Sequence, residues 1–333
     1  MTGRAALLAL ALLGCAPSGA GFEALPAAPI AFVYRSVEET QRVLDEAEAR
    51  ASAGRPVAEH ELDLKLDRLG KLDATSSEQR LARDQQGHLA LFATREKRLE
   101  LPASLPRGAR PLAWSPGRQL MFSWKQRETY HLFEWNPESG EVRQLTTGTE
   151  SQIGGCFGPE RAIAWVQIDV VEGRYVTRIW IRRPGEAPRP VSDGPRDSQP
   201  SWSPAGGRLV FAAQDASGGS LLRWVDPLGT ERGSYGPGRS PRFSPDGAWI
   251  VYSGRSAHGW RLRRMHADGT GKRTLGTSGF EESDPAVSPD GRFVVFAVTK
   301  NEQSPISRLF VRSFDGSGDR QLEFAGSGLL PVW

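Results

Sequence analysis

Residues 243–252 read Phe-Ser-Pro-Asp-Gly-Ala-Trp-Ile-Val-Tyr, and near copies of this phrase recur along the 333-residue chain. Each copy has an apolar or aromatic residue, then a turn resembling Ser-Pro-Asp-Gly, then a run of apolar residues. The copies start at Trp114, Phe157, Trp202, Phe243 and Val287, at intervals of 43, 45, 41 and 44 residues. Self-similarity at such a period is typical of a fold built from one repeated supersecondary unit.

The turn inside the phrase has a definite chemistry. Proline presets φ at the second position of a type I turn, aspartate suits the third position and glycine favours the fourth. The apolar runs on both sides of the turn therefore predict two antiparallel strands of a hairpin. The second run shows little polar alternation, so we expect both of its faces to be buried.

Two more strands complete each repeat. A third run follows the hairpin, then a turn that contains glycine, then a more polar fourth run. The predicted third strands cover residues 130–135, 177–181, 221–225, 260–265 and 308–311. Four strands in about 44 residues correspond to one blade of a β-propeller.

The two ends of the chain together supply a sixth blade. The final residues Pro331-Val332-Trp333 repeat the start of the phrase, and the chain ends before the second strand of that hairpin. Residues 30–34 match the missing strand, and residues 88–94 and 97–101 supply the outer two. The sequence therefore predicts an all-β, six-bladed β-propeller of four-stranded blades over residues 30–333. Pairing of the C-terminal strand with an N-terminal strand closes the ring and removes exposed sheet edges.

An insertion at about residues 36–86 interrupts the sixth blade and lacks the repeated phrase. Ser36 and Glu39 resemble a capping box, which predicts a helix over residues 37–51. We expect a partly helical insertion that packs beside the ring.

The remainder of the insertion is open to more than one interpretation. Leu62, Leu64 and Leu66 alternate with charged residues, which suits a strand or the start of a helix. Residues 36–110 could also be counted as a whole seventh blade, but that stretch lacks the turn phrase.

The first residues have the features of an export signal. Arg4 gives a positive start, and residues 5–13 form an apolar run that is too short to span a bilayer. The run ends in Leu12-Leu13-Gly14-Cys15, which resembles the lipobox of bacterial lipoproteins. The resemblance implies cleavage before Cys15 and acylation of this cysteine, and several acyl chains give stable anchoring.

We therefore expect a lipoprotein signal peptide at residues 1–14 and a lipidated anchor with a spacer at residues 15–29. The alternative is an ordinary signal peptide that is cleaved somewhere between residues 16 and 20. No aspartate follows Cys15, so attachment to the outer membrane, facing the periplasm, is the expected location.

Composition restricts the possible partners and covalent links. Hydrophobic residues make up 38% and charged residues 24%, which is ordinary for a globular protein. The net charge is only +3, and the basic side chains are spread over predicted outer strands. Because we also expect the protein to be exported, nucleic acid is not expected as a partner. With Cys15 acylated, Cys156 has no partner for an intrachain disulfide, and we expect it to be a buried apolar residue.

The repeated turn phrase followed by strands such as Ile250-Val251-Tyr252 resembles the TolB-type β-propeller, a relative of the WD-repeat proteins. The resemblance covers most of residues 88–333 together with residues 30–34. It implies a periplasmic propeller that binds a protein, since TolB binds a peptidoglycan-associated lipoprotein. TolB also has an N-terminal α/β domain for which this chain has no room, so we do not expect the protein to be TolB itself.

The sequence contains no recognisable catalytic or metal-binding motif. The histidines are at positions 60, 88, 131, 258 and 266, and none lies in His-Glu-x-x-His or is paired with cysteines at zinc spacing. No Gly-x-Ser-x-Gly motif is present. Asp246 and Asp290 suit the third position of a type I turn better than a calcium site. We therefore predict no catalytic residue, metal or cofactor, and expect His131 to be at the surface or half-buried.

The residues just before each innermost strand are the candidate binding site. In the predicted fold they surround one mouth of the central channel, and propeller loops often carry function. The candidates are Glu150, Ser151, Gln152, Asp197, Ser198, Gln199, Arg239, Ser240, Glu282, Ser283 and Asp284. Simple solvation of loops would also explain their polar character.

The leading hypothesis is a lipid-anchored envelope protein whose propeller binds a protein, or a glycan, without catalysis. The alternative is a propeller enzyme, a lyase or glycosidase that acts on polysaccharide. Such an enzyme would need converging carboxylates, or a metal cluster that includes histidines such as His131 and His258.

Overall fold

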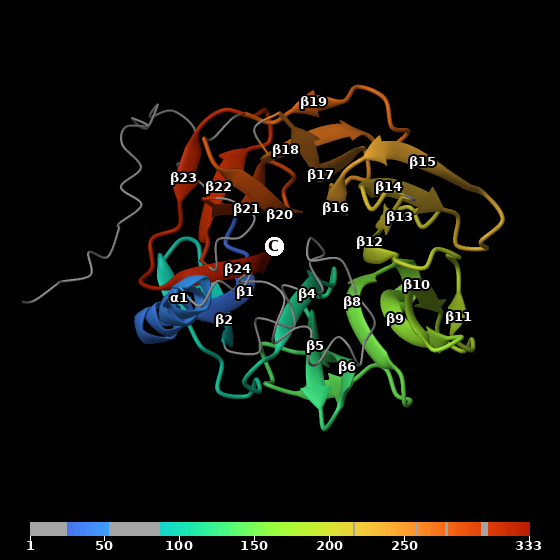
Figure 1. The fold of residues 1–333 in the computed structure, drawn as a ribbon, viewed down its shortest axis with the longest axis horizontal. Helices are drawn as coiled ribbons and strands as arrows, with labels where there is room; N and C mark the ends of the chain where they lie inside the picture. Colours follow the sequence, from blue (N-terminus) through green and yellow to red (C-terminus); the bar gives the residue numbers. More distant parts are fainter. Residues whose placement is uncertain (1–24, 53–86, 216, 258, 277–278, 301–305) are drawn as a thin grey trace, which may run out of the picture.

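The computed structural model describes residues 25–52, 87–215, 217–257, 259–276, 279–300 and 306–333. These residues form six four-stranded antiparallel sheets that are arranged in a ring (Figure 1). The predicted all-β, six-bladed propeller is confirmed. The predicted signal peptide, Cys15, and residues 53–86 with Leu62, Leu64 and Leu66 lie outside the described residues.

Five blades follow one another along the chain, and each runs from an innermost strand at the axis to an outer strand at the rim. Blade 1 contains β4 (Arg110–Trp114), β5 (Leu120–Gln126), β6 (Thr129–Trp135) and β7 (Val142–Gln144). Blade 2 contains β8 (Ser151–Phe157), β9 (Ile163–Val171), β10 (Arg174–Arg182) and β11 (Arg189–Pro190). Blade 3 contains β12 (Ser198–Trp202), β13 (Leu209–Gln214), β14 (Ser220–Val225) and β15 (Arg232–Pro237). Blade 4 contains β16 (Arg239–Phe243), β17 (Trp249–Ser256), β18 (Gly259–His266) and β19 (Arg273–Thr274), and blade 5 contains β20 (Glu281–Val287), β21 (Phe293–Thr299), β22 (Arg308–Ser313) and β23 (Asp319–Gln321).

Blade 6 is assembled from both ends of the chain, as predicted. Its strands are β24 (Ser327–Val332), β1 (Ile30–Arg35), β2 (His88–Ala93) and β3 (Arg98–Glu100), in that order from the axis. β1 pairs with β24 through Ala31 opposite Val332 and Val33 opposite Leu329. The indole Nε1 of Trp333 donates a hydrogen bond of 3.0 Å to the carbonyl oxygen of Ala28. The ring is therefore closed by hydrogen bonds between the two ends.

The hairpin turns have the predicted chemistry. The N–H of Gly247 donates to the carbonyl oxygen of Ser244 at 2.8 Å, and Gly247 has φ of +72°, a conformation that glycine adopts without strain. The Asp246 carboxylate accepts a hydrogen bond of 3.0 Å from the N–H of Ala248. The turn at Ser288 and Asp290 repeats these contacts, so both aspartates stabilise their own turns.

The core lies between neighbouring blades. The second strands are buried on both faces, as expected, and Phe32, Phe122 and Phe296 lose all contact with solvent. Trp202 and Trp333, which occupy the same position in the repeat, are buried in the clusters between blades, and Trp114 packs half-buried against another. These tryptophans therefore pack between the blades.

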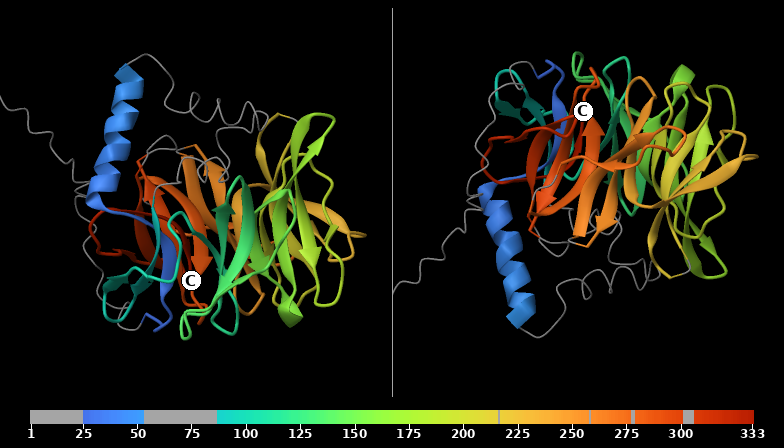
Figure 2. Two further views of the ribbon diagram at one scale, coloured as in Figure 1. Left: turned by 90° about the horizontal axis from the view of Figure 1, so that it is seen from below. Right: turned by 90° about the horizontal axis from the view of Figure 1, so that it is seen from above.

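α1 (Val37–Ser52) is the predicted helix of the insertion and follows β1 directly. Its capping box is formed: the N–H of Glu39 donates to Oγ of Ser36 at 3.1 Å, and the N–H of Ser36 donates to the Glu39 carboxylate at 3.0 Å. α1 projects from the face of the ring at which the innermost strands begin, here named the helix face (Figure 2). The opposite face carries the Ser-Pro-Asp-Gly turns and Trp333, and is named the turn face. No helix of the described residues is long and apolar enough to cross a membrane.

Candidate functional site

The innermost strands share a bulge near the helix face. Each strand shifts its register against its neighbour at this point, as between Ser198 and Ser201 in β12. In five blades one residue of the bulge has positive φ, and these residues are Gly154, Gln199, Ser240, Asp284 and Leu330. β4 of blade 1 differs and has Pro111 at the equivalent position. A bulge redirects side chains, so these residues set which groups face the axis of the ring.

Three of the predicted site residues are structural connections between strands. Gln152, Asp197 and Glu282 occupy equivalent positions and are almost completely buried, with exposed fractions of 2%, 1% and 0%. Gln152 binds Nδ1 of His131 at 2.8 Å, and Glu282 accepts a hydrogen bond of 2.8 Å from the N–H of Leu262. Each connects its innermost strand to the third strand of the preceding blade. The expectation that His131 is at the surface or half-buried was wrong, because Gln152 holds it in the interior.

Glu282 also belongs to a buried ionic group. The Arg312 guanidinium donates to Glu282 at 2.8 Å and to the Asp319 carboxylate at 2.6 and 2.7 Å. Burial alone would lower the pKa of Arg312, but the hydrogen bonds to Asp319 and Glu282 outweigh burial and raise it. Arg312 therefore stays charged and depends on both carboxylates for compensation.

The other predicted residues differ in exposure. Glu150 is exposed, Ser151 and Ser198 are half-buried, and Ser283 is buried. The hydroxyl of Ser151 accepts a hydrogen bond of 3.3 Å from the N–H of Tyr130. Arg239 is buried, with its guanidinium 3.9 Å from the ring centre of Trp260.

Gln199, Ser240 and Asp284 form a continuous polar arc, here named the axial arc. The side-chain amide of Gln199 donates to Oγ of Ser240 at 2.9 Å, and Oγ of Ser240 lies 3.0 Å from the Asp284 carboxylate. Gln199 also accepts a hydrogen bond of 2.8 Å from the N–H of Ser240. The three residues come from three successive innermost strands, which surround the axis (Figure 1). The structure thus brings together three of the eleven predicted residues as neighbouring groups at the axis.

Arg242 lies in β16, two residues after Ser240, and was not predicted. It occupies the repeat position just before the aromatic or apolar residue that starts each turn phrase. The five equivalent residues are small: Ala113, Cys156, Ser201, Ala286 and Val332. Alignment of the repeats position by position would have revealed this single charged residue among small ones.

Cys156 is buried, as expected. Burial raises the pKa of the Cys156 thiol to about 12, although the Arg242 charge acts in the opposite direction. The thiol is therefore protonated at neutral pH and is a poor nucleophile.

The histidines do not form a metal centre in the described part of the chain. No group of three His, Cys, Asp or Glu side chains there is arranged to hold a metal ion. His88 lies 3.7 Å from the Glu39 carboxylate, and His266 stacks on Trp249 with ring centres 4.0 Å apart. His60 and His258 lie outside the described residues.

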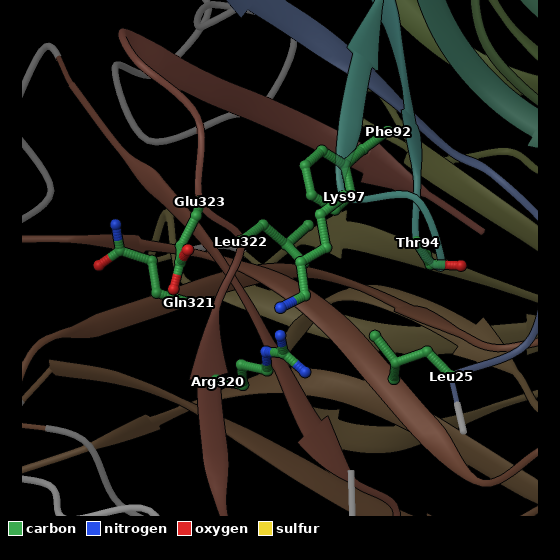
Figure 3. A pocket seen from close by; sticks show the side chains of 8 residues that line it. All are labelled: Leu25, Phe92, Thr94, Lys97, Arg320, Gln321, Leu322 and Glu323. Carbon is green, nitrogen blue, oxygen red and sulfur yellow. The ribbon is translucent and has the colours of Figure 1, made fainter. Parts of the chain in front are cut away.

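A small pocket lies between blades 5 and 6 (Figure 3). Its lining comes from the segment before β1, from β2 and the turn that follows it, and from β23 and the residues after it. These residues are Leu25, Phe92, Thr94, Lys97, Arg320, Gln321, Leu322 and Glu323. Leu25 is buried here, and the hydroxyl of Thr94 donates to the carbonyl oxygen of Pro26. The pocket marks where the N-terminal segment is fixed to the ring.

Asp197 makes the stability of the ring dependent on pH. Burial raises its pKa to about 6, against hydrogen bonds from Ser192 and Gly194 that lower it. Asp197 therefore binds a proton more readily in the folded state than in the unfolded chain. The ionised carboxylate destabilises the folded state, and this destabilisation disappears as pH falls from above 6 to below 4. We expect Asp197→Asn to stabilise the protein at pH 7.5, by about 3 kcal/mol at most, and to give no advantage at pH 4. Urea unfolding of both proteins across this range tests the prediction, and an advantage independent of pH would contradict it.

Comparisons with known proteins support the fold. No family model matches the chain. An uncharacterized protein of Agrobacterium fabrum is 22% identical over 257 residues, which are 74% of this chain and 87% of the relative. A solved structure of a TolB candidate from Agrobacterium tumefaciens has a TM-score of 0.58 and 19% identity, and covers 71% of this chain and 87% of its own. TolB from Acinetobacter baumannii has a TM-score of 0.62 and 15% identity, over 92% of this chain and 66% of that one. At these identities the likeness establishes a TolB-like propeller fold alone.

Proposed function

We propose that the protein is a non-enzymatic binding scaffold of the bacterial cell envelope, anchored by a lipid on Cys15 in the outer membrane. Its helix face recognises a protein partner in the periplasm. The TolB-like fold supports this proposal, because TolB-type propellers include periplasmic proteins that bind other proteins. The lipobox at residues 12–15 supports the anchor.

The observation that carries the proposal is the axial arc. Gln199 and Asp284 are half-buried, so solvent reaches them although they lie at the innermost strands. They place an amide and a carboxylate group at the start of the innermost strands, bonded to Ser240. Convergent polar groups in an otherwise apolar ring are typical of a recognition site.

Two structures project from the helix face around the axis. One is α1, and the other is the hairpin of β9 and β10, which are nine residues long each (Figure 2). Val170, near the tip of this hairpin, is 64% exposed, and Val37, at the start of α1, is 46% exposed. Exposed apolar residues around a polar centre suit contact with a protein.

The path of the N-terminus supports the proposed orientation. Pro26 and Ala28 are fixed at the turn face by hydrogen bonds to Thr94 and Trp333. About ten residues separate Cys15 from Leu25, which is a reach of about 35 Å at most. A lipid on Cys15 would hold the turn face near the membrane and direct the helix face away from it.

Affinity capture from detergent-solubilised envelopes tests the function. Gln199→Trp places a large side chain at the axis, and we expect it to reduce recovery of the partner by about tenfold or more. Glu141→Trp is the matched control, because Glu141 is exposed near the turn face and its side chain has no role in the site. Equal recovery by Gln199→Trp and the wild type would refute binding at the axial arc.

A further inference from the structure

We propose that the pocket between blades 5 and 6 binds the phosphate group of an anionic phospholipid in the membrane that carries the protein. Two cationic side chains at this pocket, Lys97 and Arg320, take no part in the proposed recognition of a protein at the helix face. The inference goes beyond the scaffold function, and it rests on the proposed anchor at Cys15 only for the presence of a bilayer beside the pocket.

Lys97 and Arg320 come from different blades and line the same pocket. Lys97 ends the turn after β2 in blade 6, and Arg320 lies in β23 of blade 5. Figure 3 shows the ammonium group of Lys97 and the guanidinium of Arg320 directed toward each other. Neither side chain forms an ion pair or a hydrogen bond with any residue that the structure describes. Two like charges repel each other, so an anion between them would be stabilised by both.

The carboxylates nearest in sequence are paired with other residues. Glu100 pairs with Arg98 at 2.6 Å, and Asp319 pairs with Arg312 at 2.6 Å. Glu323 lines the pocket and is exposed, and it forms no ion pair with any described residue. The lining therefore has two positive charges and one negative charge. This balance suits an anion with a single charge, such as a phosphodiester.

The floor of the pocket is apolar. Leu25, Phe92 and Leu322 are buried and belong to the hydrophobic cluster between blades 5 and 6. Cations above an apolar floor are complementary to an amphiphilic ligand, with its anionic group at the mouth and carbon atoms below. Lys97 supplies a point charge and Arg320 a planar fork of donors, and both groups bind phosphate oxygens.

The size of the pocket favours a lipid over a soluble ligand. Its volume is about 10 Å³, which is room for about one water-sized group. Sites for soluble small molecules typically enclose about 300–1,000 Å³. A phospholipid needs no such enclosure, because its acyl chains stay in the bilayer and its head group is already concentrated at the protein surface.

The pocket lies on the side of the ring that the proposed anchor holds near the membrane. The hydroxyl of Thr94, in the lining, donates to the carbonyl oxygen of Pro26, which is fixed at the turn face. Leu25, also in the lining, is ten residues after Cys15, so a lipid on Cys15 lies within about 35 Å of the pocket. The anchor and the pocket then contact the same bilayer, which fixes the orientation of the ring as well as its distance.

Native mass spectrometry of the full-length chain, released from a neutral detergent, counts the bound phospholipids. The probes are dioleoylphosphatidylglycerol, which is anionic, dioleoylphosphatidylcholine, which is zwitterionic, and glycerophosphoglycerol, which is the anionic head group without acyl chains. We expect dioleoylphosphatidylglycerol to bind at least about tenfold more tightly than either of the other two probes. Equal binding of the two phospholipids, or of dioleoylphosphatidylglycerol and its head group alone, would overturn the proposal.

Variants assign the effect to the two cations. Lys97→Gln together with Arg320→Gln should abolish the preference for the anionic lipid. Arg118→Gln together with Arg292→Gln is the matched control, because it removes the same charge from exposed turns of other hairpins. Glu323→Gln should strengthen binding of the anionic lipid several-fold by removal of a like charge, so it tests the proposal even if the first double variant does not fold. Equal binding by the wild type, the first double variant and Glu323→Gln would contradict the proposal.

The same experiment separates this proposal from the proposed function. The mass of the intact chain shows whether Cys15 carries acyl groups, and affinity capture of the protein partner should not change in the Lys97 and Arg320 double variant. An acylated chain that captures its partner but shows no preference for the anionic lipid would refute the lipid site alone. A chain that prefers the anionic lipid but carries no acyl groups would refute the anchor and support the anion site.

Discussion

Truncation of the chain after Gly326, which removes β24 and Trp333, is expected to abolish the folded ring. β1 would lose its inner neighbour, and the pairing of Ala31, Val33 and Arg35 with β24 would disappear. Val332 and Trp333 are buried, and burial of two such side chains contributes about 5 kcal/mol. With several hydrogen bonds at about 1 kcal/mol each, the loss approaches the whole stability of a typical domain, about 5–15 kcal/mol.

We expect the cooperative unfolding transition in urea, measured by circular dichroism, to be lost. We also expect the truncated protein to aggregate through the open edge of β1. A circular permutant supplies the control. Because Trp333 contacts Ala28, a short glycine linker can join the two ends, with new termini in the exposed turn at Glu172. This permutant should unfold cooperatively. A truncated protein that unfolds like the wild type would show that the ring does not depend on closure by β24.

Glu282→Ala is expected to destabilise the protein by about 3–5 kcal/mol, because it leaves the buried Arg312 guanidinium without one of its carboxylates. The substitution also removes the acceptor for the N–H of Leu262. The midpoint of urea unfolding measures the effect.

Two further variants separate the buried charge from other causes. Glu100→Ala breaks the exposed pair with Arg98, so we expect a change below about 1 kcal/mol. The double variant Glu282→Met with Arg312→Met removes both buried charges and should recover much of the stability, since Asp319 is partly exposed and keeps contact with water. Equal effects of Glu282→Ala and Glu100→Ala would contradict the assigned role of the ionic group.

The fold could be predicted because its determinants are local and repeated. The Ser-Pro-Asp-Gly turns depend on four adjacent residues, and each apolar run is buried in the same way in every blade. Even the closure could be predicted, because Val332 and Trp333 end the chain halfway through a repeat that residues 30–34 complete. The helix over residues 37–51 followed from the capping box of Ser36 and Glu39.

The roles of individual site residues were harder to predict. Gln152, Asp197 and Glu282 precede the innermost strands and look like loop residues, but the preceding blade buries them when the ring forms. His131 is buried for the same reason, through a contact with a residue 21 positions away. The sequence alone does not show whether a polar side chain is solvated or forms a hydrogen bond in the interior of the protein. Arg242 was missed because its significance appears only in comparison with five other blades.

Photo-crosslinking in intact cells tests most directly whether the helix face binds the partner. A photoreactive residue at Glu150 or Val170, both exposed on the helix face, should form a covalent adduct with the partner. The same residue at Glu141 or at Leu228, which is 65% exposed on the turn face, should form none with it. Adducts from positions 141 and 228, with none from positions 150 and 170, would contradict recognition through the helix face.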